Sequence, residues 1–371
     1  MNARLVFRFL ATIVLVVPSQ VAADPLTSFQ GPPVPVTLGD IQPHNAAPEN
    51  RGNEFYSEWW SFVFRLDGGY SAYVQFLVSN MGAGDDKAAV SSDFKPPTGD
   101  QVRDRSDFEA GKWTSSKDQF ELHFGPNVLG GPIDGLTIHV ENESFTADYK
   151  LTNIIAPWKP GNGKVQYGKS PGSYYQFQAM APVAHVEGTV TLADDGSVHK
   201  VKGLVYADHS VASIGMHQQA RRWARFRSLG EKTTFLLSDI QAPDAYGQTP
   251  IRFVALFQDG KVAFQSTDFE IRGSDSLADN KKAGYDAPRL LEFRSKDGAA
   301  ATFRGAVRGT NLTAREDFLE QSNAATRFVV SKFAKPIMYY FDGSFAAESI
   351  SPVGKIDARG KGTYYFTVVN P

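Results

Sequence analysis

The chain has 371 residues, no cysteine, a formal net charge of −2, and 27 Phe, 14 Tyr and 5 Trp. The missing cysteines exclude disulfides, thiolate nucleophiles and cysteine metal ligands. The balanced charge, without a sustained basic stripe, argues against nucleic acid as a partner. Stability must therefore come from buried apolar surface, which a chain of this length can supply in two domains of ~150 residues or in one large β domain.

The first residues have the layout of a secretory signal peptide. Arg4 and Arg8 form a positive region, residues 9–17 are apolar, and small residues at 21–23 offer a cleavage site. The apolar stretch is shorter than the ~20 residues that span a bilayer, and no stop-transfer pattern follows it. We therefore expect residues 1–23 to be removed rather than kept as an anchor, and the protein to be secreted or periplasmic without an integral membrane anchor.

Residues 24–53 are rich in Pro, Asn and Gly, which predicts an extended leader on the surface. The β-rich runs 59–66 and 70–78 flank an Asp-Gly-Gly turn at 67–69 and predict a hairpin. Further Asp-Gly pairs follow at Asp134-Gly135, Asp195-Gly196, Asp259-Gly260, Asp297-Gly298 and Asp342-Gly343. Short strands with regular tight turns predict an all-β fold of antiparallel barrels or sandwiches, with less than roughly a sixth of the chain in helices.

Two polar stretches, 85–107 and 273–288, interrupt this rhythm. The first predicts a long loop, which is either a lid at a barrel mouth or a flexible insertion. Helical periodicity is weak, so only 213–221 and 316–325 could form short helices.

No strong catalytic signature is present, whether a Gly-x-Ser-x-Gly elbow, a Walker loop, a His-Glu-x-x-His pair or a dinucleotide fingerprint. The histidines are His44, His123, His139, His185, His199, His209 and His217. Their spacings match no familiar metal motif, so we expect neither a metal site nor a cofactor.

The segment 203–210 is the densest in reactive groups. On a strand, Tyr206 and Asp208 share one face, because side chains alternate with period two. A carboxyl held in an apolar cavity can stay protonated and donate a proton. The alternative is an Asp at the end of a strand that makes a turn, with Tyr206 as ordinary core.

Two further clusters could contact a ligand. Glu58 beside Trp59 and Trp60 could orient a polar head group while the rings stack on an apolar molecule; alternatively, Glu58 lies outside and one Trp faces the core. In the run 221–227, four residues share one face if it forms a strand: Arg221, Trp223, Arg225 and Arg227. They could form an Arg–Trp ladder with cation–π contacts that grips an anionic head group, or a solvated face.

The order of several short motifs resembles the carotenoid 1,2-hydratase/AttH superfamily. These motifs are Glu58-Trp59-Trp60-Ser61-Phe62, Tyr73-Val74-Gln75, Val186-Glu187-Gly188-Thr189-Val190 and Tyr206-Ala207-Asp208-His209. Others are closer to its fungal survival-factor branch: Trp158-Lys159-Pro160-Gly161, Tyr167-Gly168, and Gly215-Met216 followed by Ala220, Arg222 and Trp223. The likeness covers residues 55–226 well and the C-terminal half loosely.

This resemblance implies two tandem lipocalin-like antiparallel β-barrels, which we place at 54–212 and 213–371. It also implies a hydrophobic ligand, a lipid or an isoprenoid, because members of the superfamily bind lipids, hydrate a carotenoid alkene or catalyse pericyclic cyclisation. In an enzyme, Asp208 would be the acid, with Tyr206 and His209 beside it. Where hydratases continue with a Trp, this chain reads Ser210-Val211-Ala212.

Two hypotheses follow. The preferred one is a non-catalytic binder or carrier of a lipid or isoprenoid, whose ligand contacts would come from Glu58, Trp59, Trp60, Arg222 and Trp223. The other is an acid–base hydratase or cyclase that acts on an isoprenoid alkene through Asp208. The two differ in whether Tyr206 and Asp208 open into the main cavity.

Overall fold

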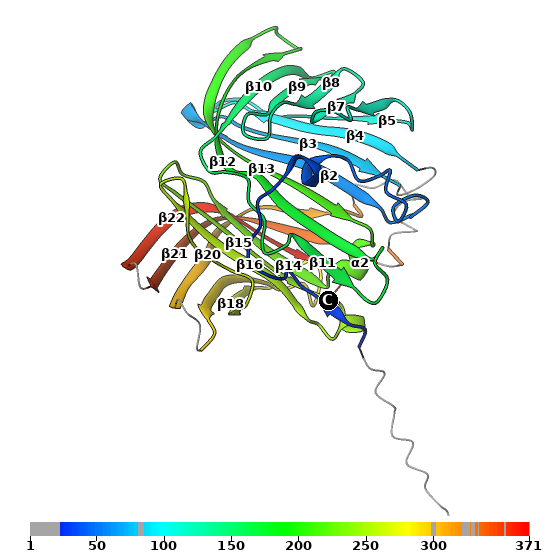
Figure 1. Ribbon diagram of the computed structural model, residues 1–371. Coiled ribbons are helices and arrows are strands. Elements are labelled where there is room, and N and C mark those ends of the chain that lie inside the picture. The colour runs from blue at the N-terminus through cyan, green and yellow to red at the C-terminus, as the bar shows by residue number, and fades with distance from the viewer. Residues whose placement is uncertain are drawn as a thin grey trace, which may run out of the picture.

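A computed structural model describes residues 23–80, 85–297, 302–320, 327, 331–332, 334–351 and 354–370. The apolar and basic parts of the expected signal peptide fall on residues 1–22, outside the described residues. The described chain folds into two large antiparallel sheets, one formed by β1 to β13 and the other by β14 to β22 (Figure 1).

The N-terminal sheet curls into a nearly closed barrel. Its strands are β1 (Leu26–Thr27), β2 (Ser57–Leu66), β3 (Ser71–Ser79), β4 (Lys87–Lys95), β5 (Val102–Phe108), β6 (Trp113–Ser115), β7 (Glu121–Phe124), β8 (Asn127–Gly130), β9 (Thr137–Glu141), β10 (Phe145–Asn153), β11 (Lys164–Tyr167), β12 (Tyr174–Leu192) and β13 (Val198–Ala212). The pairing order is β5-β4-β3-β2-β13-β12-β10-β9-β8-β7-β6, and β11 pairs with β1 and β12 beside this path. The indole of Trp113 in β6, one end of the path, donates a 2.8 Å hydrogen bond to the carbonyl of Asp86, just before β4, which is the second strand from the other end.

The C-terminal sheet repeats the same order. Its strands are β14 (Arg222–Ser228), β15 (Thr233–Gln241), β16 (Pro250–Gln258), β17 (Lys261–Ser266), β18 (Phe269–Leu277), β19 (Ala287–Ser295), β20 (Thr302–Asp317), β21 (Ile337–Ser351) and β22 (Gly354–Val368). They pair as β17-β16-β15-β14-β22-β21-β20-β19-β18. In each sheet the first long strand (β2 or β14) therefore pairs with the last (β13 or β22). The prediction of two tandem lipocalin-like barrels is confirmed.

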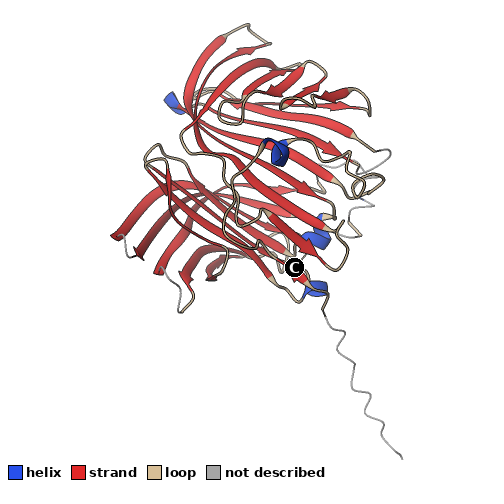
Figure 2. Ribbon diagram, in the orientation of Figure 1, coloured by secondary structure: helices blue, strands red, loops and turns tan. Residues whose placement is uncertain are grey.

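Helices are a minor part of the structure (Figure 2). The helices with described bounds are α1 (Leu38–Ile41), α2 (Met216–Gln219), and the short 3-10 helices η1 (Asp67–Gly69) and η2 (Asp244–Tyr246). The all-β prediction is confirmed, and α2 lies in the expected segment 213–221. Of the second expected helix, residues 316–317 belong to β20 instead, and 321–325 lie outside the described residues. Nowhere in the described chain is a helix long and apolar enough to cross a membrane.

Several turns were predicted correctly and some segments were not. The hairpin of β2 and β3 forms around η1, and Asp259 and Gly260 join β16 to β17 with φ of 47° and 76°. The prediction of a long loop at 85–107 is wrong, because β4 and β5 occupy most of this segment. Within β4, Val90 and Phe94 are buried, and none of the three polar residues between them is exposed. The polar break at 273–288 begins late, because β18 continues to residue 277.

The Asp-Gly pair at 342–343 is not a turn, because it lies inside β21. Gly343 faces the packed interior there: a Cβ would lie 2.9 Å from a ring carbon of Phe226. Glycine at this position therefore allows close packing rather than a reversal of the chain.

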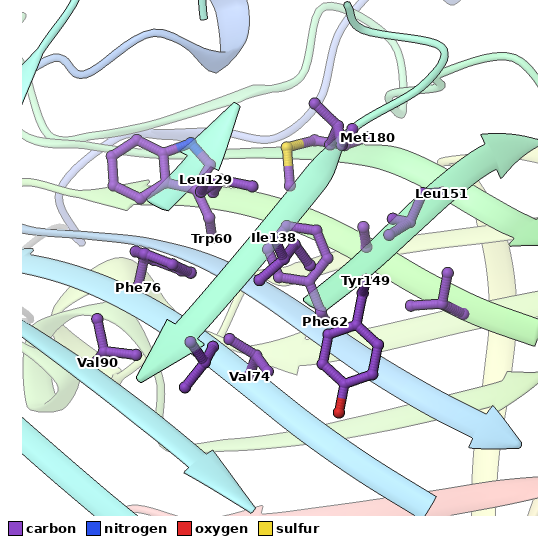
Figure 3. Close-up of a cluster of buried hydrophobic side chains, with 14 of the residues drawn as sticks. Trp60, Phe62, Val74, Phe76, Val90, Leu129, Ile138, Tyr149, Leu151 and Met180 are labelled. Atoms are coloured by element: carbon purple, nitrogen blue, oxygen red, sulfur yellow. The ribbon is translucent and has the colours of Figure 1, made fainter. Parts of the chain in front are cut away.

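Three buried clusters hold the fold together. The first fills the N-terminal barrel, where the rings and aliphatic chains in Figure 3 point toward one another from both walls. A second fills the concave side of the C-terminal sheet with aromatic rings such as Phe235 and Phe345, stacked 4.5 Å apart. The third lies between the sheets, where β12, β13 and β2 pack against β14, β15 and β16. Both barrel interiors are occupied by the protein's own side chains.

Candidate functional site

Strand alternation divides the predicted site residues between two environments. On β13, Tyr206 and Asp208 face the C-terminal sheet, while the residues that alternate with them, such as Val205 and Ala207, line the N-terminal barrel. The prediction that Tyr206 and Asp208 share a face is confirmed. His209 points to the opposite face of β13 and meets Trp60 and Glu58, so the structure brings Tyr206 and Asp208 together and places His209 apart from them. Tyr206 and Asp208 face neither solvent nor the barrel interior.

The Glu58-Trp59-Trp60 run is divided in the same way. Glu58 and Trp60 are fully buried inside the N-terminal barrel, and Trp60 stacks on His209 with ring centroids 4.7 Å apart. Trp59 lies on the other face of β2 and packs, partly exposed, against the layer between the sheets. Because consecutive residues of a strand point to opposite faces, the structure does not bring the two indoles together. One Trp faces the core, as the alternative expected, but Glu58 lies inside with it and not outside.

The layer between the sheets, called here the interface cluster, is rich in aromatic rings. Its buried aromatic members are Phe29, Trp158, Tyr167, Tyr175, Phe177, Tyr206, Phe253 and Phe257. Phe253 is at its centre: its ring stacks on Phe177 at 5.0 Å and meets Trp158 edge-on at 5.4 Å. The partly exposed Trp59, Val63 and Trp223 pack around this cluster.

The predicted ladder exists on β14 except for Arg221, which precedes the strand. Trp223, Arg225 and Arg227 share the face toward the interface cluster. The Arg225 guanidinium lies 5.8 Å from the Trp223 ring centroid, and its Nη2 donates to the Tyr175 hydroxyl at 3.1 Å. The Arg227 guanidinium lies over Tyr206, 4.6 Å from the ring centroid.

Arg222 does not accompany Trp223, because adjacent strand residues point apart. It lines a small cavity of about 140 Å³ on the other side of β14, together with Asp239 and Arg252. Arg252 pairs with Asp239 there, with Nε 3.0 Å from Oδ1. A single ligand that contacts both Arg222 and Trp223 does not fit this geometry.

Four buried polar atoms in the layer between the sheets have no hydrogen-bond partner. They are Asp208 Oδ1, Ser210 Oγ, Arg227 Nε and Thr367 Oγ1. Asp208 is 3% exposed, and Ser210 and Thr367 are fully buried. Burial raises the pKa of the neighbouring Tyr206 well above its usual value, and the charge of Asp208 raises it further. Because buried polar groups are normally paired, this layer is suited to a ligand or to water that offers donors and acceptors.

A second cluster, called here the His–Glu–His cluster, consists of His44, Glu58 and His209. The Glu58 Oε1 atom lies 3.0 Å from His44 Nδ1 and 2.7 Å from His209 Nε2. The Tyr56 hydroxyl donates to Glu58 Oε2, and the His44 backbone N–H donates to it at 2.9 Å. One donor atom from each residue of the His–Glu–His cluster lies within 4.8 Å of the other two, so the set could hold a metal ion.

The ionisation of this cluster follows from its hydrogen bonds. Burial alone raises the pKa of Glu58, but the hydrogen bonds from His209 and His44 outweigh it and lower the pKa to about 2. Burial lowers the pKa of His209. For His44, burial also acts downward, but the bond to Glu58 raises the pKa above its usual value. Glu58 is therefore a buried carboxylate at neutral pH.

The leader, residues 24–53, is fixed at this cluster and does not merely lie on the surface. The Trp60 indole donates to the Ile41 carbonyl at 2.9 Å, and Ile41 is fully buried in the N-terminal core. The Lys159 ammonium pairs with Asp40 at 2.7 Å. The leader thus crosses the N-terminal sheet (Figure 1) and closes part of it.

The sequence profile of the Svf1 family matches residues 50–368 of the chain. The protein belongs to the Svf1 family. This Svf1 family member is 23% identical over 196 residues to the ceramide-binding protein SVF1 of Candida albicans, an alignment that covers 50% of each chain. It is 22% identical over 339 residues to the ceramide-binding protein SVF1 of Yarrowia lipolytica, which covers 81% of this chain and 82% of that protein. The chain thus spans half the length of one curated relative and most of the other.

Solved structures with the same fold come from several proteins. A protein described as an AttH from Nitrosomonas europaea matches with a TM-score of 0.57 at 16% identity, over 91% of this chain and 100% of that one. CghA matches with a TM-score of 0.57 at 12% identity, over 93% and 98%. Kievitone hydratase from Nectria haematococca matches with a TM-score of 0.50 at 12% identity, over 88% and 95%. These likenesses support the fold of the Svf1 family member.

Sequence reasoning missed several residues of both clusters in this Svf1 protein. Ser210 and Thr367 are short polar residues in β-rich runs, and nothing local distinguishes them. Tyr56 precedes the Glu-Trp-Trp motif by two positions and so shares the face of Glu58, which period-two alternation could have shown. His44 lies in a segment without periodicity, where no local signal assigns a face.

Proposed function

We propose that this protein binds a neutral sphingolipid of the ceramide class between its two sheets. The observation that carries the proposal is the set of unpaired polar atoms, Asp208 Oδ1, Ser210 Oγ, Arg227 Nε and Thr367 Oγ1, within an aromatic layer. Two relatives named ceramide-binding proteins support the choice of lipid.

The chemistry of a ceramide suits these atoms. Its head offers an amide N–H, an amide carbonyl and hydroxyl groups, and carries no charge. Asp208 can accept from an N–H or O–H, Arg227 can donate to the carbonyl, and Ser210 can do either. Aromatic rings of the interface cluster supply apolar contact for the chains. Trp59 and Trp223 are only partly buried beside this cluster, so they would offer apolar contact to a chain that enters from solvent.

Other surfaces suit a neutral lipid less well. An open groove of about 970 Å³ on the C-terminal sheet is lined by five Arg and four acidic residues. Another of about 830 Å³ on the N-terminal sheet is lined partly by three Lys and two acidic residues. A lipid chain in either groove would remove water from charged side chains, which is costly. The barrel interiors are filled by the clusters that contain Phe76 and Phe235.

The test is a binding titration of the purified protein with a short-chain fluorescent ceramide. Ser210→Ala and Asp208→Asn should each weaken binding by about fivefold, the scale of one hydrogen bond of ~1 kcal/mol. Tyr149→Phe is the matched control, since Tyr149 also has a buried, unpaired hydroxyl but faces the interior of the N-terminal barrel. A diacylglycerol of equal chain length, which lacks the amide, should bind more weakly than the ceramide.

Two results would count against this site. If Tyr149→Phe weakens binding while Ser210→Ala does not, the ligand lies in the N-terminal barrel instead. If ceramide and diacylglycerol bind equally to all variants, the protein does not recognise the amide head group. Thermal melts of each variant separate a loss of binding from a loss of fold.

An acid–base enzyme is the second candidate, favoured by the buried Asp208 carboxylate oxygen that lacks a partner beside Tyr206. In that case Asp208 would deliver a proton to an alkene of an isoprenoid ligand. His209 could not assist directly, because it faces the other side of β13. Mass spectrometry of the bound ligand distinguishes the two. In an enzyme, Asp208→Asn would slow conversion of the ligand by about 10²-fold or more. A binder would return its ligand unchanged with Asp or Asn at position 208.

We also propose that the protein is exported. The support is the basic, apolar and small-residue pattern of residues 1–23. N-terminal sequencing of the mature protein from its source should begin near Asp24, and recovery of Met1 would contradict export by this route.

A further inference from the structure

The His–Glu–His cluster combines ligands from three distant parts of the chain. His44 comes from the leader, Glu58 from β2 and His209 from β13. The His44 Nδ1 and His209 Nε2 atoms both face the same oxygen, Oε1 of Glu58, at 3.0 and 2.7 Å. Two imidazole nitrogens and one carboxylate that converge in this way form a donor set used by Zn²⁺ and by other first-row divalent ions.

The groups around the cluster have the arrangement that holds metal ligands in place. His209 Nδ1 lies 2.9 Å from the Asp40 carbonyl, and the Trp60 ring stacks on the imidazole at an interplanar angle of 4°. Glu58 Oε2, the oxygen that neither imidazole bonds, accepts from the Tyr56 hydroxyl and from the His44 backbone N–H. A ligating His commonly bonds a carbonyl through its other nitrogen, and ligating carboxylates are themselves hydrogen-bonded.

Without a metal, protons must separate these atoms. The Gln178 amide nitrogen lies 2.6 Å from His209 Nδ1. The His209 Nδ1 atom can therefore accept from this amide while His209 Nε2–H donates to Glu58. His44 Nδ1–H then donates to the same oxygen. A divalent ion takes the place of these two protons when each neutral imidazole carries its proton on its other ring nitrogen, which for His209 is Nδ1, beside the Asp40 carbonyl. His209 and Glu58 are fully buried, whereas the His44 side chain is 24% exposed and gives an ion access from solvent.

We propose that His44, Glu58 and His209 bind one divalent first-row transition-metal ion, with Zn²⁺ as the best match to two imidazoles and a carboxylate. This reverses the expectation, drawn from histidine spacing alone, that the chain has no metal site. The ion ties the leader to β2 and β13, and so closes the leader over the N-terminal sheet. The inference is independent of the lipid proposal, because the metal ligands and the interface cluster occupy opposite faces of β13.

The test uses the tag-free full chain after dialysis against a chelator. Calorimetric titration with ZnCl₂ should show one equivalent of tight binding, and CoCl₂ should give visible absorption bands of a nitrogen–oxygen site. His44→Ala and Glu58→Gln should each weaken Zn²⁺ binding by about 100-fold or more. Tyr56→Phe, which removes only a hydrogen bond to the ligating carboxylate, should weaken it by about 10- to 100-fold.

His139→Ala is the matched control, because His139 also pairs with a carboxylate, Asp148 at 2.7 Å, but on the exposed face of the sheet. It should bind Zn²⁺ like the wild type. Zn²⁺ should also slow tryptic cleavage after Arg51 in the leader of the wild type, but not in His44→Ala. The proposal is overturned if the wild type binds no Zn²⁺, or if His44→Ala and Glu58→Gln both bind as tightly as the wild type. Because His44 is partly exposed, His44→Ala keeps the test decisive even if Glu58→Gln does not fold.

Discussion

The ion pair between Asp40 and Lys159 provides a quantitative test of how the leader is attached. Asp40 Oδ1 lies 2.7 Å from the Lys159 ammonium, and the Lys159 side chain is 7% exposed against 22% for Asp40. Asp40 also accepts from the Thr37 backbone N–H and hydroxyl at 2.7 and 2.8 Å through its other oxygen. The two partners therefore differ in what they lose when the other is removed.

The expected magnitudes follow from this asymmetry. Asp40→Asn leaves a buried ammonium without its counter-ion, which costs up to ~3–5 kcal/mol in a fully buried pair; partial exposure of Asp40 reduces the expected cost to ~2–3 kcal/mol. Lys159→Met keeps the apolar stem and leaves a carboxylate that retains the Thr37 bonds and some water, so ~1–2 kcal/mol is expected. The double variant leaves no buried charge and should cost less than the sum of the two by ~1–2 kcal/mol.

The measurement is urea unfolding of the wild type, both single variants and the double variant, together with hydrogen exchange of residues 37–44. If the leader detaches before the rest unfolds, exchange there will show the loss when the global transition does not. The reasoning is refuted if the two substitutions are additive, or if Lys159→Met is more destabilising than Asp40→Asn.

Three further predictions concern the fold. In urea unfolding, Phe253→Ala should lower the free energy of unfolding by ~3–5 kcal/mol, because Phe253 is 7% exposed and lies among aromatic rings. Val262 is 43% exposed, so Val262→Ala should change the same free energy by less than ~0.5 kcal/mol. Gly188→Ala should cost ~1–3 kcal/mol or more, since its Cβ would lie 2.3 Å from a backbone oxygen of β10; Gly39→Ala, with no contact closer than 3.8 Å, should stabilise α1 by ~0.4–1 kcal/mol in the same assay. Burial raises the pKa of Tyr73 from 10.0 to about 12, so the contribution of Tyr73 to stability is complete below pH 10 and is lost as the pH rises toward 12. Ultraviolet titration of the wild type against Tyr73→Phe measures this pKa, and ionisation of Tyr73 at pH 10 would contradict the prediction.

Local sequence rules predicted which residues share a face, but not what that face meets. Period two placed Tyr206 with Asp208 and separated Trp59 from Trp60. A face of a strand can meet a barrel interior, solvent or another sheet, and the choice depends on how residues 222–228 dock many positions later. The 85–107 segment shows a different failure: its polar composition outweighed the alternation that buries Val90 and Phe94 in β4.

The His–Glu–His cluster was beyond any spacing rule. Glu58 lies 14 positions from His44 and 151 from His209. The pairing of β2 with β13 places His209 opposite Trp60 and thereby next to Glu58, and only the path of the leader then brings His44 onto the same oxygen. Motif searches detect ligands that one helix or one turn brings together, whereas this set is assembled by sheet closure.

Sheet closure also explains why motifs far apart in the sequence meet. In each sheet the first long strand pairs with the last, so β2 and β13 adjoin in one, and β14 and β22 in the other. The side chains of β14 meet those of β12 and β13 across the layer between the sheets, and the motifs at 58–60, 206–209 and 222–227 lie on these two central pairs. The same four strands carry the unpaired polar atoms, which belong to Asp208 and Ser210 in β13, Arg227 in β14 and Thr367 in β22. Leaving such an atom buried and unpaired costs ~1–3 kcal/mol, a loss that apolar residues of similar size would avoid. In this sheltered layer, either buried water or a bound molecule with matching donors and acceptors can recover that free energy. The proposed amide-bearing lipid is a molecule of the second kind.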